Sequence, residues 1–203
     1  MGYAPHINRA LDLYGSIAFW APPGNGFGFA VDPLFILCQS ALETGHFKSD
    51  LIKTANNAFG MNYRSDPVSP EIGETSSGFA IYENLDDAVF DYCKRQADFH
   101  VYTGTDPLSY AQSTKASGYA EDPDYIAKWM AIWNNVWAYD WAQAVGAEFG
   151  TGPGPGPNDQ DGTGNGNGQG SGTGNGQGIG NGGTNLVPWL VGAAVVTKAL
   201  KLW

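Results

Sequence analysis

A single carboxylate at the end of an apolar helical stretch is the first feature of this chain that could do chemistry. Glu43 lies in the segment CQSALETGHF (residues 38–47), and Gly45 is a residue type that commonly ends helices. Apolar surroundings favour the neutral form of a carboxyl group, which is the form that a general acid needs near pH 7. Taken alone, however, the stretch is better explained by a solvated glutamate at a helix end.

Four further segments follow in a fixed order and change that interpretation. They are NNAFGM (residues 56–61), FAIY (79–82), LDDAVFDY (85–92) and SGYAEDPDY (117–125). Each segment is weak evidence, but the ordered series is specific. It resembles the glucosaminidase domain of glycoside hydrolase family 73, and the resemblance covers about residues 7–137.

The resemblance implies a lysozyme-like α-lobe with a small β-lobe. It also implies a peptidoglycan hydrolase that cleaves the β-1,4 bond between N-acetylglucosamine and N-acetylmuramic acid, with no metal or organic cofactor. A lysozyme-like muramidase or a lytic transglycosylase is the near alternative. The alternative from another class is a non-catalytic wall-binding or virion structural protein that kept the fold.

The same resemblance assigns roles to single residues. Glu43 is expected to be the general acid that protonates the leaving glycosidic oxygen. A second carboxylate is expected from the β-lobe, where Glu74 is preferred to Glu71 and Asp66 is the third candidate. A retaining, an inverting and a substrate-assisted course all stay open.

Five other residues are expected at the substrate. Tyr119 matches a family tyrosine near the cleft that helps to position the sugar. The expected substrate-binding residues are Asn57, Phe59, Tyr82 and His46. His46 stands where many relatives carry tryptophan, so this chain departs from the family pattern at that position.

Helix-start signals place these residues on a mainly helical, α+β framework. Asp-Pro pairs at 32–33, 106–107 and 122–123 predict helix starts, because aspartate caps free N–H groups and proline fits the first helical position. Asn84 predicts a fourth start, and a further helix is expected over His6 to Ala18. Between Gly60 and Tyr82 the helical pattern stops, which predicts a β-hairpin inserted after the second helix.

Tryptophans recur every four residues towards the end of this region, at 129, 133, 137 and 141. On one last helix they would form a slanting stripe. Packing against the helical bundle is preferred over a sugar-stacking surface.

Charge and cysteine content narrow the class of protein. The formal net charge is −10 and no basic run occurs, which argues against nucleic-acid binding. The two cysteines, Cys38 and Cys93, lie in apolar helical stretches, where buried free thiols are commoner than a disulfide. Cysteine and histidine do not cluster at zinc spacing.

The composition changes after residue 149 and predicts three regions. Residues 1–149 form the catalytic domain, and residues 150–185, rich in glycine, asparagine and proline, read as a flexible linker. Residues 186–203 form an apolar stretch with Trp189 and Trp203 near its ends, as expected of a membrane-anchoring helix. A segment lying in the membrane interface or docked on a partner protein is the alternative.

A wall hydrolase with a linker and an apolar end, but without a recognisable signal peptide, suggests a phage protein. The expected locations are a virion, with or without an internal membrane, and the host membrane, where the enzyme would face the cell wall. A bacterial envelope autolysin is the runner-up.

Overall fold

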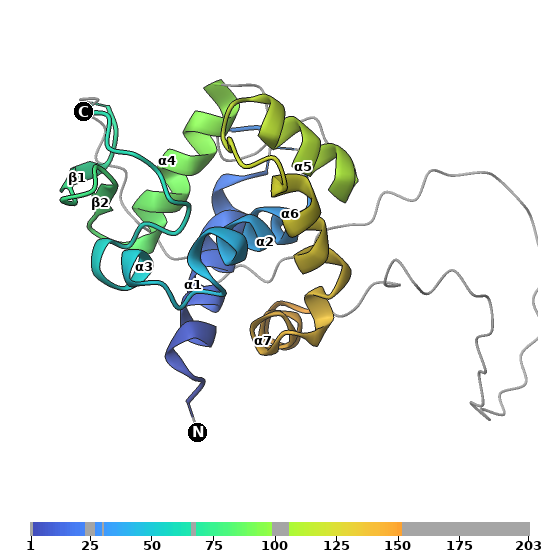
Figure 1. The fold of residues 1–203 in the computed structure, drawn as a ribbon. Helices are drawn as coiled ribbons and strands as arrows, with labels where there is room; N and C mark the ends of the chain where they lie inside the picture. The colour runs from blue at the N-terminus through green and yellow to red at the C-terminus, as the bar shows by residue number, and fades with distance from the viewer. Residues whose placement is uncertain (1, 23–26, 30, 66–67, 99–105, 152–203) are drawn as a thin grey trace, which may run out of the picture. The chain divides into compact units, whose positions relative to one another are not determined.

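Seven α-helices, one 3₁₀ turn and one two-stranded antiparallel sheet make up the part of the chain that the computed structural model describes (Figure 1). The described residues are 2–22, 27–29, 31–65, 68–98 and 106–151. The mainly helical fold with a small β-hairpin that the sequence predicts is therefore confirmed. The predicted linker (150–185), the apolar segment (186–203) and the candidate acid Asp66 lie outside the described residues, apart from the first two linker positions.

Capping residues determine where most of the helices begin. Helix α2 (Pro33–Thr44) starts at Asp32, whose carboxylate accepts from the Leu34 N–H at 2.9 Å. Helix α5 (Pro107–Ala116) starts in the same way, with Asp106 accepting from the Ser109 N–H at 2.9 Å. These two predicted starts are confirmed, as are α1 (Pro5–Trp20) and α4 (Leu85–Asp98).

The third Asp-Pro pair is an exception. Helix α6 begins at Tyr125 and not at Pro123, because the Asp122 carboxylate accepts from the Asp124 N–H at 2.9 Å and makes a turn there.

Helix α2 occupies the centre of the helical part. Only Pro33, Leu42 and Glu43 of this helix escape full burial. Helices α1 and α6 pack against α2, and α1 also contacts α4 and α7. A central, apolar helix therefore carries the carboxylate that the sequence singles out.

The β-hairpin consists of β1 (Glu71–Glu74) and β2 (Ala80–Tyr82), which pair with Glu71 opposite Tyr82 and Glu74 opposite Ala80. A register irregularity lies between Glu71 and Gly73. A short helix that the sequence analysis did not identify, α3 (Asp50–Ala55), lies between α2 and the hairpin. Ser49 caps α3 by accepting from the Ile52 N–H at 3.4 Å.

The four tryptophans do not lie on one helix, which corrects the sequence-based prediction. Helix α6 (Tyr125–Asn134) ends, a 3₁₀ turn η1 (Val136–Ala138) follows, and α7 (Asp140–Phe149) starts anew. Asn135 breaks the helix, since its side chain donates to the Ala131 carbonyl at 2.9 Å. Trp129 and Trp141 are buried, with 0% and 1% of their surface exposed, so these two indoles do pack in the core.

Two further observations concern expectations from the sequence. Cys38 and Cys93 are both buried and free. Across the described residues, no helix combines the length and the apolar character needed to cross a bilayer. The predicted anchor segment, 186–203, is not among those residues.

Candidate active site

Glu43 lies one residue before the end of α2, next to a loop that is tied to this helix. The left-handed Gly45 (φ 55°) ends α2, and its N–H bonds the Ala41 carbonyl. The Ser40 hydroxyl donates to the Ala58 carbonyl at 2.8 Å, which fastens the loop around Asn57–Gly60 to α2. A Cβ on Gly60 would lie 3.2 Å from Glu43 Oε2, so glycine leaves the space that this oxygen needs.

Burial makes Glu43 a carboxyl group that keeps its proton near neutral pH. Desolvation raises its pKa from 4.5 to about 7, although a hydrogen bond from Gln39 acts in the opposite direction. Gln39 Nε2 donates to Glu43 Oε1 at 2.8 Å. Because Oε1 accepts this bond, the proton of the neutral acid resides on Oε2, the oxygen next to Gly60.

A second hydrogen bond orients Gln39 itself. The Tyr125 hydroxyl donates to Gln39 Oε1, and Gln39 is fully buried. Burial raises the pKa of Tyr125, so its hydroxyl stays protonated and acts as the donor. The carboxamide of Gln39 must then present its N–H₂ group to Glu43. The two hydrogen bonds, from Tyr125 to Gln39 and from Gln39 to Glu43, thereby determine which oxygen of the acid carries the proton.

Tyr119 and Phe59 connect this site to α4. The Tyr119 hydroxyl donates to the Phe59 carbonyl, one residue before Gly60. Phe59 stacks on Tyr92 of α4 with ring centroids 4.0 Å apart, and Tyr119 meets the same ring edge-on at 5.9 Å. Burial, followed by the charge of Glu43, raises the pKa of Tyr119, which is consistent with its position near the acid.

Asn57 braces the loop against the hairpin and is fully buried. Its Nδ2 donates to the carbonyls of Met61 and Ala80, at 2.8 and 2.9 Å, and its Oδ1 accepts from the Met61 N–H at 3.0 Å. Phe59 and Tyr82 are also buried, each with 1% of its surface exposed. These three side chains, expected at the substrate, support the site from behind and offer no surface to a sugar.

His46 lies on the side of the helical part formed by α7. Its Nδ1 accepts from the Trp141 indole N–H at 3.2 Å, and its ring packs on Tyr139 with centroids 4.4 Å apart. Burial lowers the pKa of His46 and favours the neutral ring. The structure therefore engages His46 with α7 and not with the loop next to Glu43.

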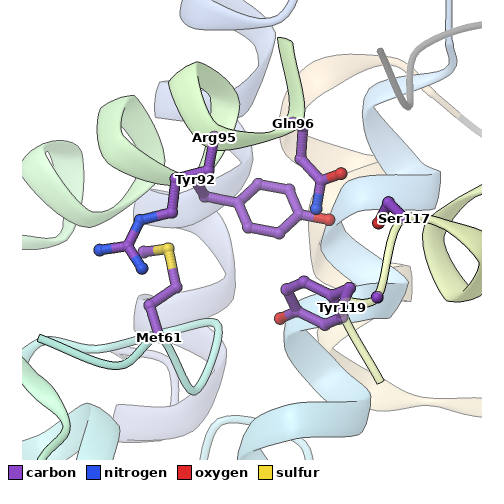
Figure 2. Close-up of a pocket in the computed structure, with 7 residues that line it drawn as sticks. Met61, Tyr92, Arg95, Gln96, Ser117 and Tyr119 are labelled. Atoms are coloured by element: carbon purple, nitrogen blue, oxygen red, sulfur yellow. The ribbon is translucent and has the colours of Figure 1, made fainter. Parts of the chain in front are cut away.

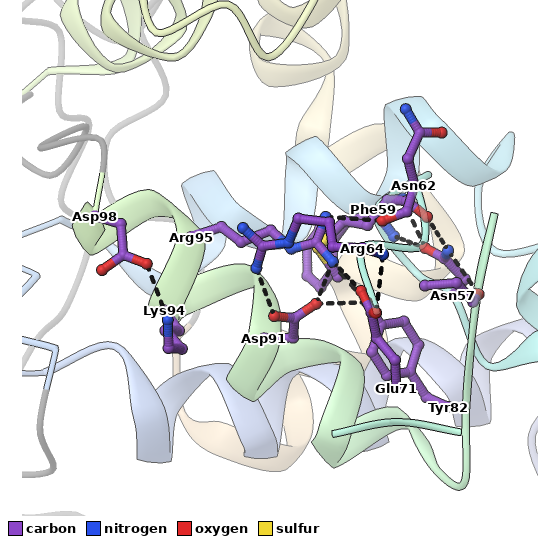
Figure 3. Close-up of polar contacts among 12 residues, drawn as sticks. Asn57, Phe59, Asn62, Arg64, Glu71, Tyr82, Asp91, Lys94, Arg95 and Asp98 are labelled. Carbon is purple, nitrogen blue, oxygen red and sulfur yellow. Dashed lines mark hydrogen bonds and ion pairs between the residues drawn. The ribbon is translucent and has the colours of Figure 1, made fainter. Parts of the chain in front are cut away.

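The two hairpin glutamates occupy different environments, and Figure 3 shows that of Glu71. The side chain of Glu71 is 1% exposed and pairs with Arg95 through Oε1, while Oε2 accepts from the Arg64 N–H at 3.0 Å. Asp91, fully buried, contacts Arg95 at 2.6 Å and Arg64 at 3.3 Å, and it accepts from the Tyr82 hydroxyl at 2.7 Å. Glu74 is exposed, and its side chain has no hydrogen-bond partner among the described residues. Of the two glutamates, only Glu74 is free to act on a bound water or sugar.

The described part of the chain holds no group of three or more His, Cys, Asp or Glu side chains arranged to bind a metal ion.

A family comparison decides what class of enzyme carries this site. Residues 28–137, more than half of the chain, match the family described as mannosyl-glycoprotein endo-beta-N-acetylglucosaminidase, or glucosaminidase. The chain belongs to this family. It is therefore a glycoside hydrolase with the glucosaminidase fold that its motifs predict. No curated protein matches the chain.

Several solved structures resemble this glucosaminidase-family chain. A peptidoglycan hydrolase from Sphingomonas sp. A1 is 22% identical, with a TM-score of 0.48, and the match covers 72% of this chain and 93% of that one. A type VI secretion system effector-immunity complex from Pseudomonas protegens gives 20% identity, a TM-score of 0.47 and coverages of 71% and 97%. The catalytic domain of the autolysin Auto from Listeria monocytogenes gives 16%, 0.42, 71% and 90%.

The glucosaminidase site includes residues that the sequence analysis did not identify. Gln39 had a detectable signal, because a spacing of four residues places it on the same helix face as Glu43. Tyr125 ends the SGYAEDPDY motif, but its bond to Gln39 could not be predicted, since the two residues lie 86 positions apart in the chain. The Glu71–Arg95–Asp91 network likewise depends on contacts that only the fold creates.

Removing the hydrogen bond to Glu43 is expected to shift the pH dependence of hydrolysis. In the double variant Gln39→Met and Tyr125→Phe, the ionised form of Glu43 loses its donor, and no buried hydroxyl is left without a partner. The pKa of Glu43 then rises further, so the acid stays protonated to higher pH. The basic limb of the kcat/KM profile moves upward from about pH 7, where the parent is half-protonated. An unchanged limb in the variant, measured beside exposed Gln112→Leu, contradicts the role of Gln39.

Proposed function

We propose that this chain hydrolyses peptidoglycan at the β-1,4 bond between N-acetylglucosamine and N-acetylmuramic acid. The observation that carries the proposal is the burial of Glu43 near the end of α2, which raises its pKa to about 7 and leaves Oε2 as the oxygen that does not accept from Gln39. The family description, which names an N-acetylglucosaminidase, and the solved peptidoglycan hydrolase from Sphingomonas sp. A1 support the choice of substrate.

Glu43 donates its Oε2 proton to the glycosidic oxygen as the bond to the sugar breaks. The anomeric carbon gains positive charge, which a second carboxylate or the substrate itself must balance before water attacks. We assign this second role to Glu74, because both oxygens of Glu71 already have partners. Tyr119 contributes by holding the Phe59 carbonyl and with it the loop next to the acid.

Glu74→Gln tests the assignment of the second carboxylate. We expect the rate of wall hydrolysis to fall by about 100-fold, because an amide neither activates water nor balances positive charge. Thermal stability stays unchanged, since Glu74 is exposed. Exposed Glu83→Gln, beyond the end of the hairpin, serves as the matched control. Full activity of Glu74→Gln would instead assign the role to the substrate's own N-acetyl group or to another residue.

Fragment analysis tests the bond that is cleaved. Purified cell walls are digested with the protein, and the soluble products are reduced and analysed by mass spectrometry. Reducing-end N-acetylglucosamine is the expected product. Reducing-end muramic acid identifies a muramidase, and anhydro-muramic acid identifies a lytic transglycosylase. Wall binding without release of any fragment indicates a non-catalytic binding protein.

We also propose that residues 186–203 tether the enzyme to a membrane, in a virion or in the host envelope. The support is the sequence alone: an apolar stretch flanked by Trp189 and Trp203, joined through a linker rich in glycine. In this proposal, the glycine-rich stretch serves as a linker that keeps the tethered catalytic domain at a high local concentration near the wall. Fractionation of the full chain with lipid vesicles tests this, and a protein that stays wholly soluble contradicts it.

A further inference from the structure

A small pocket lies beside the active site, and its wall contains a buried polar atom without a hydrogen-bond partner (Figure 2). Its volume is about 110 Å³, and it lies between α4, the loop that leads to Tyr119, and Met61. Tyr119 belongs both to this pocket and to the active site, because its hydroxyl holds the Phe59 carbonyl next to Gly60. A group bound in the pocket therefore lies close to the loop that contacts Glu43.

This unpaired atom belongs to the side chain of Gln96. Only 5% of this residue is exposed, and its Oε1 is buried without a hydrogen-bond partner. Figure 2 shows its carboxamide on the same side of the pocket as Ser117 and Tyr119. An unpaired buried acceptor destabilises a fold, so its presence in a pocket wall indicates a donor that arrives with a ligand.

Apart from Arg95 Nε, the other side-chain polar groups around the pocket already have hydrogen-bond partners. The hydroxyls of Tyr92 and Tyr110 bond each other at 3.0 Å, and Ser117 donates to the Thr114 carbonyl at 2.7 Å. Arg95 uses its terminal N–H groups on Glu71, Asp91 and the Asn62 carbonyl. Its Nε lacks a partner too, but Figure 2 shows Arg95 on the far side of the Tyr92 ring from Gln96. On the Gln96 side, the wall thus offers one free acceptor next to the aromatic rings of Tyr92 and Tyr119, while the Met61 side chain lines the pocket on the side of Arg95.

We propose that this pocket binds the N-acetyl group of a sugar residue in the glycan substrate, with the amide N–H donating to Gln96 Oε1 and the methyl group packing on the apolar wall. An acetamido group has both required parts, a donor and an apolar end, and it is small enough for the pocket. A bare hydroxyl would leave the apolar wall empty, and an ammonium group would lose its hydration there. This inference rests on the proposed function, because it specifies how the same site recognises an N-acetylated glycan.

The proposal predicts opposite effects of Gln96→Leu on stability and on binding. Leucine removes an unpaired acceptor from a buried position, so the melting temperature is unchanged or higher. Affinity for an N-acetylated glycan falls by about tenfold, which corresponds to the loss of one hydrogen bond. A glutamine with a merely structural role would give a lower melting temperature and no selective loss of affinity.

The test measures binding of soluble peptidoglycan glycan fragments to the full chain carrying Glu43→Gln, which prevents hydrolysis during titration. Fragments with intact acetyl groups are compared with chemically de-N-acetylated fragments. We expect Gln96→Leu to weaken binding of the acetylated fragments only, so that the preference for them largely disappears. Ser117→Leu, which puts a larger apolar side chain into the pocket wall, is expected to do the same. Gln112→Leu, an exposed glutamine on α5, is expected to change neither affinity.

Two results overturn the inference. If Gln96→Leu lowers the affinity for both kinds of fragment equally, Gln96 does not recognise the acetyl group. If neither Gln96→Leu nor Ser117→Leu changes any affinity, no substrate group enters the pocket. The proposed function is tested separately, by fragment release from walls with the parent chain. If the parent releases no fragments, the proposed function fails, whatever the variants bind.

Discussion

Glu43→Gln is expected to lower the rate of wall hydrolysis by about a thousandfold while the fold stays intact. Glutamine keeps the shape of the side chain and still accepts from Gln39 Nε2, but it cannot release a proton to the glycosidic oxygen. The measurement is the release of reducing ends from purified walls at pH 6, where most of the parent acid is protonated. Glu148→Gln, an exposed glutamate on α7, is the control and should retain full activity.

Stability measurements on the same variant independently test the burial of the Glu43 side chain. The folded-state pKa of Glu43, about 7, lies above the ordinary value of 4.5, so the folded protein holds this proton more tightly than the unfolded chain. The stability linked to Glu43 is therefore complete below pH 4.5 and decreases as the pH rises through 7. Glu43→Gln avoids that loss and should be more stable than the parent at pH 8. Retained hydrolysis, or a variant less stable at pH 8 than the parent, contradicts the assignment of Glu43.

Those features of the fold that depend on neighbouring residues could be predicted from the sequence. Asp32, Asn84 and Asp106 start helices because a short polar side chain caps the free N–H groups next to it in the chain. Gly45 ends α2 because it adopts a left-handed conformation at little cost. The hairpin follows from a break in the helical pattern and a short run of β-prone residues.

Features that depend on distant contacts could not be predicted. The break between α6 and α7 keeps the four-residue spacing of the tryptophans, so the pattern alone suggests one continuous helix. Tyr82 and Asn57 were expected at the substrate because their motifs match the family, yet their polar atoms are bound to Asp91 and to backbone carbonyls. The choice between Glu71 and Glu74 also needed the fold, since the two residues are three positions apart on one strand and differ in their burial and in their partners.

Arg95→Met is the second variant with a large expected effect, and this effect is on stability. Arg95 lies between two buried carboxylates, Glu71 and Asp91, whose side chains are 1% and 0% exposed. Without Arg95, Glu71 loses its cationic partner and Asp91 keeps Arg64 alone, and breaking such a buried pair costs about 3–5 kcal/mol. We expect the free energy of unfolding to fall by that amount and the melting temperature to fall by roughly 10 °C. Chemical and thermal denaturation measure the two quantities.

The neighbouring residue on α4 provides a matched control for this prediction. Lys94 pairs with Asp98 at 3.0 Å, but this pair is on the surface, with side chains 27% and 55% exposed (Figure 3). Lys94→Met should therefore change the free energy of unfolding by less than about 1 kcal/mol. Equal effects of the two substitutions would mean that burial does not strengthen the Arg95 network.

A double-mutant cycle then separates the two roles considered for Glu71. If Glu71 is a structural partner of Arg95, Glu71→Met and Arg95→Met are non-additive, with a coupling free energy of about 0.5–3 kcal/mol. The double variant leaves no unpaired Glu71 carboxylate, so it should be less destabilised than the sum of the single variants. If Glu71 were the second catalytic carboxylate, Glu71→Met would abolish hydrolysis even at temperatures where the variant is fully folded. We expect the folded variant to keep measurable activity, because Glu74 remains on the same strand to act at the anomeric carbon.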